Sequence, residues 1–247
     1  MKAMIFAAGL GTRLRPLTDT MPKALVPVGG TPLLEILMKK MIASGVSDVV
    51  INIHHFGEQI VDFIEKNRSF GINVQFSDER AELLETGGGI KYAAPLLTAG
   101  STQNEHFLIH NVDILSNLDL GAFYKSCRPD AAAMLVVSCR ETQRYLLFNE
   151  EDRLVGWTNI KTGEVKSPYP NLDVDKCKRY AFAGIHLISS RLFPHFDKWG
   201  SKFSIIEFYL SVCHEEPIYA HICTDLKLMD VGKQDTLSKA ESFVKEM

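Results

Sequence analysis

The sequence lacks both an excess of positive charge and a long apolar run. Its 247 residues hold 27 Lys and Arg against 30 Asp and Glu, which gives a formal net charge of −3. Without a basic field to attract a nucleic-acid backbone, any phosphate-binding site must be local. No apolar run approaches the roughly 20 residues of a membrane-spanning helix, and the N-terminal apolar stretch is too short for a secretory signal. We therefore expect a cytoplasmic protein without nucleic-acid or membrane partners.

Cysteines are few, and repeats are missing. The five cysteines are odd in number, scattered and never spaced as C-x-x-C, so the sequence predicts neither a disulfide framework nor a zinc site. It contains no low-complexity linker and no hexapeptide period typical of a parallel β-helix. With 46% hydrophobic residues, the chain can build a sizeable core. These features predict one folded domain over residues 1–247.

The first half alternates apolar runs with amphipathic segments. The run 2–8 ends in a glycine-rich turn, and Thr31 followed by Pro32 predicts a helix start, with Gly45 just past the helix end. Such alternation implies right-handed crossovers and a mostly parallel, mixed sheet covered by helices on both faces, an α/β Rossmann-like three-layer αβα fold. Strands are expected at 2–8, 48–53, 72–77 and 107–112, and helices at 32–42, 57–66 and 86–97.

The pattern changes after Cys127. Three short apolar segments with short connections predict an antiparallel excursion from the parallel sheet. Residues 160–179 are polar, hold two prolines and predict an exposed loop or hairpin that could overhang a site. The expected strands are 131–139, 145–150, 153–159, 180–189, 218–223 and 226–231, and the expected helices are 204–213 and 233–245.

Residues 7–30 concentrate glycine and positive charge directly after the first strand. Glycines let backbone N–H groups approach a polyphosphate closely, and Arg13, Arg15 and Lys23 can neutralise its oxygens. A dinucleotide fingerprint would need a third glycine at Leu14, and the Gly-Lys-Ser/Thr of a P-loop is missing. The prolines of the loop also disfavour an NAD-dependent oxidoreductase. The segment therefore predicts a phosphate-binding loop of another type.

Two aspartates follow apolar strands as metal ligands often do. Asp113 comes after 107–112 and Asp230 after LKLM, so both are expected at the carboxyl edge of one sheet, where two carboxylates would bind a hard cation. The alternative is that Asp113 caps a following helix and Asp230 shapes a tight turn before Gly232. Because the phosphate loop is also present, the metal interpretation is favoured.

Several stretches of this sequence resemble the sugar-1-phosphate nucleotidyltransferase family. GLGTRLRPLTDTMPKALVPVGGTPLLE (9–35) is similar to its G-x-G-T-R-x-x-P-x-T opening, HNVDIL (110–115) to its strand-end aspartate, and LMDVGKQDTL (228–237) to its aspartate-valine/isoleucine-glycine element. The order and spacing also fit, over essentially the whole chain. ETGGGIKYAAPLL (85–97) is particularly similar to the short N-acetylmuramate-1-phosphate uridylyltransferase branch. Mannose- and heptose-1-phosphate guanylyltransferases share much of the pattern.

The resemblance implies the nucleotide-diphospho-sugar transferase fold and an enzyme that joins a nucleoside triphosphate to a sugar 1-phosphate, giving a nucleotide sugar and pyrophosphate. It implies Mg²⁺ as the cofactor, residues 1–113 as the nucleotide-binding half and 114–247 as the sugar-phosphate-binding half. The expected substrates are UTP and N-acetylmuramate 1-phosphate or a related hexose 1-phosphate. The alternatives are guanylyl transfer to mannose or heptose 1-phosphate, and a non-catalytic nucleotide-sugar-binding module.

The resemblance also implies roles for individual residues. Arg13, Lys23 and Asp113 are expected to be catalytic, and Asp113 and Asp230 to bind the metal. The nucleotide is expected to contact Ala8, Gly9, Gly11, Thr12 and Arg13, with Glu85 and Gly88 reading the base. Gly184 is expected to lie against the sugar, or else to be a strand glycine at a bulge. The family's glutamate-lysine-proline motif is replaced by LVGWTNIKTGEV, in which Lys161 or Glu164 is a candidate substitute and a solvated hairpin the alternative.

Overall fold

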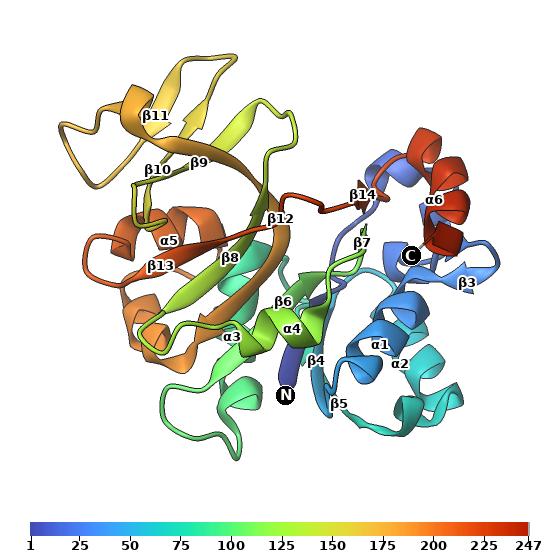
Figure 1. Ribbon diagram of the computed structural model, residues 1–247. Helices are drawn as coiled ribbons and strands as arrows, with labels where there is room; N and C mark the ends of the chain where they lie inside the picture. The colour runs from blue at the N-terminus through green and yellow to red at the C-terminus, as the bar shows by residue number, and fades with distance from the viewer. Residues whose placement is uncertain (247) are drawn as a thin grey trace.

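A mixed ten-stranded sheet forms the centre of the computed structural model, which describes residues 1–246 (Figure 1). Strands β6, β1, β4 and β5 lie side by side and parallel, and β12 continues the sheet antiparallel to β6. Strands β9, β10 and β11 follow antiparallel, while β8 pairs with both β12 and β13. The predicted α/β fold and its antiparallel part after Cys127 are thus confirmed. The strands are β1 (Lys2–Phe6), β4 (Asp48–Ile53), β5 (Asn73–Asp78), β6 (His106–Asn111), β8 (Ala133–Ser138), β9 (Arg144–Phe148), β10 (Leu154–Asn159), β11 (Glu164–Lys166), β12 (Lys178–Ser189) and β13 (Ile218–Ile222).

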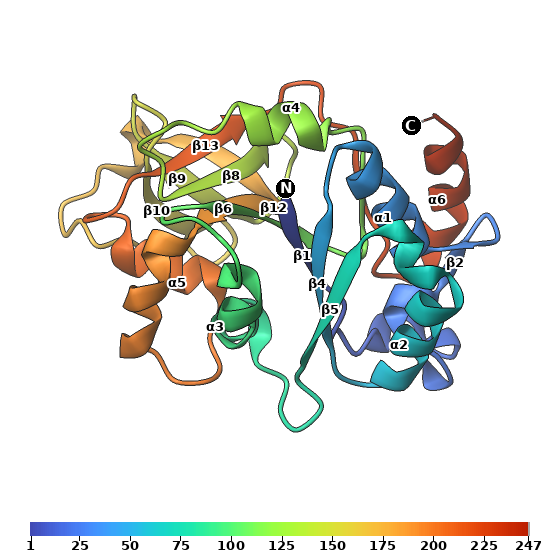
Figure 2. The same ribbon diagram turned by 90° about the horizontal axis from the view of Figure 1, so that it is seen from below.

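Helices cover both faces of the sheet (Figure 2), because its central strands are apolar on both sides. Ala3 and Ile5 of β1 pack in one core cluster with residues of α1 and α2, whereas Met4 points the other way, into a cluster with α3 and α5. All three side chains are fully buried. The helices are α1 (Leu33–Ala43), α2 (Gly57–Lys66), α3 (Glu85–Thr98), α4 (Leu120–Lys125), α5 (Ile205–Val212) and α6 (Gln234–Glu246).

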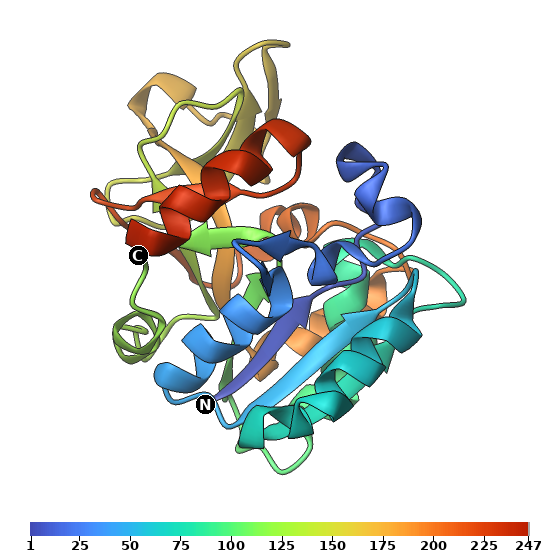
Figure 3. The same ribbon diagram turned by 90° about the vertical axis from the view of Figure 1, so that its right-hand side faces the viewer.

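Two short strand pairs stand outside the main sheet. Strand β2 (Pro27–Val28) pairs with β3 (Thr31–Pro32), and β7 (Ile114–Ser116) pairs with β14 (Leu228–Asp230). Residues 7–30, which follow β1, are called the first loop. Helix α6 contacts both β2 and β14, and Figure 3 shows it lying across the end of the molecule that carries the first loop. The C-terminal segment is therefore joined to the N-terminal loop region. None of the helices within residues 1–246 is long and apolar enough to cross a membrane.

The predicted start of the first helix, with Thr31 as the cap and Pro32 as the first helical residue, was wrong by one residue. Thr31 and Pro32 form strand β3, and α1 begins at Leu33 without a side-chain cap. The cause is the pair Gly29 and Gly30, whose φ angles of 57° and 82° allow a two-residue hairpin between β2 and β3. The expected loop or hairpin at 160–179 is confirmed in part: β11 pairs with the preceding β10 to form a hairpin that ends at residue 166, and no strand is formed between residue 166 and β12.

Candidate functional site

A cavity of about 260 Å³ lies at the carboxyl ends of β1, β4, β5 and β6, where ligands commonly bind in α/β sheets. We call it the first-loop cavity. Five residues that were predicted to bind nucleotide or to act in catalysis lie on its wall, and every residue that lines it belongs to the predicted nucleotide half, 1–113. The lining consists of Phe6, Ala7, Ala8, Gly9, Lys23, Asn52, Glu79, Leu83, Glu85, Thr86, Asn111, Val112 and Asp113.

A buried amide holds the first loop in place. The Oδ1 atom of Asn52 accepts hydrogen bonds from the N–H groups of Ala7 at 2.6 Å and Ala8 at 3.2 Å. Its Nδ2 donates to Oε1 of Glu79 at 2.8 Å, and Oε2 of Glu79 accepts from the N–H of Leu84 at 3.4 Å. Burial raises the pKa of Glu79. One network therefore connects the first loop with the segment that leads into α3.

Gly11 makes the turn that brings the first loop back toward the cavity. Its φ is 63°, and a Cβ atom there would lie 2.8 Å from Cγ2 of Thr18 and 3.1 Å from Cβ of Lys23. Both the backbone conformation and the close approach require glycine at this position. The carbonyl oxygen of Gly11 also accepts a hydrogen bond from Oγ1 of Thr18 at 2.8 Å. The predicted nucleotide-binding residues Thr12 and Arg13 follow this turn and are exposed.

The structure brings Lys23 and the two predicted metal ligands together. Nζ of Lys23 forms an ion pair with Oδ2 of Asp113, and only 11% and 20% of these side chains are exposed. The pairing of β7 with β14 sets Asp230 opposite Ile114, and the N–H of Val231 donates to the carbonyl oxygen of Asp113 at 2.8 Å. Because β7 follows Asp113 at once, the alternative that this residue caps a helix is wrong.

Arg13 approaches the same place from the first loop. A Cβ atom at Gly232 would lie 2.6 Å from Oδ1 of Asp230 and 2.8 Å from Nη2 of Arg13, so both side chains lie against this glycine. Two cations and two carboxylates thus meet where the N-terminal loop and β14 adjoin. Within residues 1–246, no group of three His, Cys, Asp or Glu side chains has the arrangement of a metal site. A cation here would take two protein carboxylates at most.

Glu85 and Gly88 lie in different surroundings. Glu85 begins α3 with a φ of 62° and lines the first-loop cavity. Gly88 lies inside the helix, where a Cβ atom would collide with the carbonyl oxygen of Ser201. The N–H groups of Gly87 and Gly88 donate to the carbonyl oxygen of Phe203 at 2.8 and 3.2 Å. These glycines therefore permit close packing of α3 on the 201–203 segment, and the N–H group of Gly88, a residue expected to read the base, already has a partner in Phe203.

Gly184 faces a second cavity, of about 390 Å³, which we call the junction cavity. It lies at a bulge in β12, with a φ of 74°, and a Cβ atom there would be 2.8 Å from Nδ2 of Asn111. Gly184 is thus a bulge glycine that also lines a cavity. Asn111 belongs to both the junction and the first-loop cavities, so the two adjoin. The junction cavity is lined by Asn111, Ile114, Arg140, Phe182, Ala183, Gly184, Leu228 and Asp230.

Comparison with known proteins shows which family the chain belongs to. A family model described as nucleotidyl transferase matches residues 2–146. The chain belongs to the nucleotidyl transferase family. An N-acetylmuramate alpha-1-phosphate uridylyltransferase from Neisseria meningitidis serogroup B is 42% identical over 126 residues, 51% of this chain and 52% of that protein. A mannose-1-phosphate guanyltransferase from Gibberella zeae is 34% identical over 149 residues, 59% of this chain and 40% of that protein.

The chain spans about half the length of the curated relatives it matches. Similarity to solved structures extends over nearly the whole chain. The inositol-1-phosphate CTP transferase from T. maritima superposes with a TM-score of 0.75 over 99% of this chain and 96% of that chain, at 15% sequence identity. The fold is therefore that of the nucleotide-diphospho-sugar transferases, as the resemblance implied.

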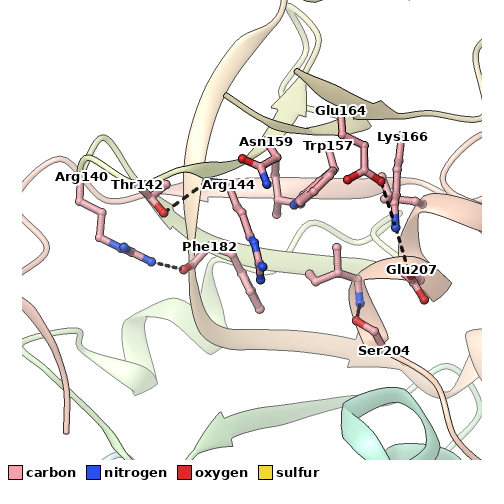
Figure 4. A pocket seen from close by; sticks show the side chains of 13 residues that line it. Arg140, Thr142, Arg144, Trp157, Asn159, Glu164, Lys166, Phe182, Ser204 and Glu207 are labelled. Atoms are coloured by element: carbon pink, nitrogen blue, oxygen red, sulfur yellow. Dashed lines mark hydrogen bonds and ion pairs between the residues drawn. The ribbon is translucent and has the colours of Figure 1, made fainter. Parts of the chain in front are cut away.

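A third cavity, about 530 Å³ in volume, lies between the antiparallel strands and α5 (Figure 4). We call it the distal cavity. It shares Arg140 and Phe182 with the junction cavity, and Glu164, a candidate for the missing sugar-phosphate motif, lies on its wall, whereas Lys161 does not. Its lining is Arg140, Thr142, Arg144, Leu146, Trp157, Asn159, Glu164, Lys166, Phe182, Ser204, Ile206, Glu207 and Leu210.

Four polar residues that line these cavities were not predicted from the sequence. Asn52 was hidden in the apolar run DVVINI, where a single amide in a buried strand is itself a signal. Glu79 follows the next strand. Arg140 and Arg144 flank the apolar strands of the antiparallel part, and only the pairing of those strands with β12 brings them to a cavity.

Proposed function

We propose that this protein transfers a nucleotidyl group from a nucleoside triphosphate to a sugar 1-phosphate and releases pyrophosphate. The observation that carries the proposal is the meeting of Arg13, Lys23, Asp113 and Asp230 beside two adjoining cavities. The first-loop cavity would hold the nucleotide and the junction cavity the sugar phosphate. Membership of the family supports this assignment. Because the reactants are phosphorylated metabolites, we also propose the cytoplasm as the location.

The chemistry needs alignment and charge neutralisation rather than a protein nucleophile. A phosphate oxygen of the sugar 1-phosphate attacks the α-phosphorus, the bond from that phosphorus to the bridging oxygen of the β-phosphate breaks, and pyrophosphate leaves in line. Lys23, at the wall of the first-loop cavity, would contact the α-phosphate or the acceptor. Arg13, exposed on the loop, would face the leaving β- and γ-phosphates.

Two carboxylates are a donor set that fits Mg²⁺. This ion is commonly held in phosphoryl-transfer sites by one or two carboxylates, with substrate phosphates and water completing its shell. Asp113 and Asp230 would hold it here, since Asp113 directly precedes β7 and Asp230 lies opposite the first residue of that strand. When bound, Mg²⁺ supplies neutralisation of phosphate charge and orients the phosphate groups. Lys23 is then positioned beside the same carboxylate that would bind the metal.

For the substrates, we propose UTP and N-acetylmuramate 1-phosphate. The uridylyltransferase of N. meningitidis and a second one from Caulobacter vibrioides, 44% identical over 100 residues, support this choice. The guanyltransferase relatives make GTP with mannose 1-phosphate the competing pair.

A pyrophosphate-release screen tests the proposal. Five nucleoside triphosphates are combined with a panel of sugar 1-phosphates, with Mg²⁺ or with a chelator. We expect release that depends on Mg²⁺ and on both substrates, with kcat/KM higher for UTP than for GTP. A higher value for GTP would refute the uridylyl assignment alone. Nucleotide binding without release for any pair would instead support the non-catalytic module.

A further inference from the structure

The three cavities form a continuous row that extends beyond the proposed reaction centre. The first-loop and junction cavities share Asn111, and the junction and distal cavities share Arg140 and Phe182. The distal cavity is large enough for a sugar or a large substituent on one, since ligand pockets typically measure about 300 to 1,000 Å³. An acceptor whose phosphate lies near Asp230 would therefore extend toward the distal cavity. This step rests on the proposed function.

Strand register explains which side chains line the distal cavity. Arg144 of β9 lies opposite Asn159 of β10, which lies opposite Glu164 of β11. The neighbouring row on the same face holds Leu146, Trp157 and Lys166. Because side chains alternate between the faces of a sheet, both rows point to the cavity side. The wall thus combines an aromatic ring with amide, carboxylate and cationic groups.

The cations of the distal cavity differ in their partners. Lys166 forms ion pairs with Glu207 at 2.9 Å and Glu164 at 3.8 Å, so its charge is balanced within the wall. Nη2 of Arg140 donates to the carbonyl oxygen of Phe182 at 3.0 Å, which holds Arg140 at the junction between the cavities. Among the ion pairs and hydrogen bonds of residues 1–246, none uses the guanidinium of Arg144.

The arrangement of these charges gives the cavity two different ends. Figure 4 shows Lys166 with its two glutamates at one side, Arg140 at the other, and the Arg144 side chain pointing into the space between. The end that adjoins the junction cavity therefore carries Arg140, Arg144 lies between this end and the middle of the cavity, and the carboxylates of the cavity wall lie at the other end. An arginine fork matches a carboxylate better than it matches sugar hydroxyl groups, because it can donate two parallel charge-assisted hydrogen bonds.

We propose that Arg144 selects acceptors that carry a carboxylate in addition to the 1-phosphate, and that the distal cavity is the subsite for that carboxylate. N-acetylmuramate 1-phosphate belongs to this chemical class because its lactyl ether ends in a carboxylate. N-acetylglucosamine 1-phosphate is the same sugar without the lactyl group. Arg144 is thus a specificity-determining residue, and Arg140 anchors the passage that leads to it.

The test measures affinity for the two sugars with wild type and Arg144→Gln. Isothermal titration calorimetry is carried out on the full chain in the presence of a non-hydrolysable UTP analogue. We expect wild type to bind N-acetylmuramate 1-phosphate about tenfold or more tightly than N-acetylglucosamine 1-phosphate, as a charge-assisted contact implies. The substitution should remove this preference by weakening only the carboxylate-bearing sugar, and added salt should reduce the wild-type preference.

Arg179→Gln is the matched control. Arg179 lies opposite Leu147, so its side chain belongs to the other face of the sheet, and it pairs with Asp175 at 2.9 Å. This variant should keep the preference. Equal affinities in wild type, or equal weakening of both sugars by Arg144→Gln, would overturn the inference. Pyrophosphate release on the same preparations separates the two proposals: selectivity without release refutes the proposed function, and release without selectivity refutes this inference.

Discussion

The ion pair between Lys23 and Asp113 serves stability and the proposed chemistry at once. Both side chains are mostly buried, and a buried charge that loses its partner costs free energy because it has left water without compensation. Asp230, in contrast, is exposed on β14. Two carboxylates with the same proposed role therefore differ in what their removal does to the fold.

We predict that Asp113→Ala and Asp230→Ala each abolish Mg²⁺-dependent turnover because each removes a proposed metal ligand. Asp113→Ala should also lower the free energy of unfolding, by about 2 kcal/mol, since it leaves the Lys23 ammonium unpaired. Asp230→Ala should change it by less than about 0.5 kcal/mol. Steady-state kinetics and urea unfolding check both. Wild-type rates in either variant would remove that aspartate from the metal site.

Lys23→Ala is expected to slow pyrophosphate release by about 10²-fold or more, the loss expected when a transition-state charge contact is removed. The matched control is Lys39→Ala, because Lys39 is an exposed lysine that pairs with Glu35 on α1. Both rates are measured at saturating substrates. An unchanged rate for Lys23→Ala would mean that this ammonium has only the structural role of neutralising Asp113.

At the scale of elements, helix α3 connects the nucleotide and acceptor sides. Its first residue, Glu85, lines the first-loop cavity, and its buried glycines pack against the segment that leads into α5. A Cβ atom at Gly89 would lie 2.9 Å from Oε1 of Glu79. This carboxylate accepts a hydrogen bond from Asn52, which in turn binds the backbone of the first loop. The glycines therefore set the position of the helix relative to both neighbours.

Gly88→Ala should destabilise the protein by about 1 to 2 kcal/mol. Alanine favours a helix by about 1 kcal/mol over glycine, but the new methyl group would collide with the backbone at Ser201, and such overpacking typically costs about 1 to 3 kcal/mol, occasionally more. Gly200→Ala is the control, because a Cβ atom there meets nothing within 4 Å. Thermal unfolding compares the two, and equal stabilities would contradict the packing role of Gly88.

At the scale of the whole molecule, two buried histidines make stability depend on pH. His110 and His186 lie on the paired strands β6 and β12, and burial lowers the pKa of His110 to about 4 and that of His186 to about 3. Nδ1 of His110 hydrogen-bonds the carbonyl oxygen of Asn111 at 2.8 Å. Neither ring nitrogen of His186 has a hydrogen-bond partner among the described residues.

We predict that the free energy of unfolding falls as the pH decreases from about 6.5 to 4. The unfolded chain takes up two protons in this range that the folded protein excludes, which gives a slope of up to about 3 kcal/mol per pH unit. Glu79 has the opposite effect on the free energy of unfolding, because its raised pKa means that the folded protein binds this proton before the unfolded chain does. This effect is limited to the pH range in which Glu79 titrates. Urea unfolding at several pH values measures the slope. His186→Leu should roughly halve the slope of the unfolding free energy against pH. His55→Gln is the control and should leave the slope unchanged, because His55 is exposed. An unaltered slope in His186→Leu would refute the conclusion that His186 causes this pH dependence.

Much of the architecture could be predicted because it depends on local patterns. Apolar runs such as 48–53 and amphipathic segments such as 57–66 have the periods of buried strands and of surface helices, and both matched the structure. The prediction that Thr31 caps the first helix was wrong because Thr31 pairs with Val28 across a glycine turn, and this pairing is not visible in the local sequence pattern. Those residues of the candidate site that belong to one continuous segment could be predicted, as in the loop that contains Gly11 and Lys23.

What the sequence determined by itself is the set of short segments whose residues interact with their own neighbours. These are the first loop, the strand-end Asp113 and the alternation that leads to a Rossmann-like sheet. The sequence also predicted that Asp113 and Asp230 lie close together, but at the edge of one sheet. Only the tertiary structure decided that the separate strand pair of β7 and β14 brings them together, that Asn52 and Glu79 hold the first loop, and that Arg144 faces a cavity. The physical reason is that these contacts join segments far apart in the chain. They depend on strand order and register, which are set by packing of the whole core.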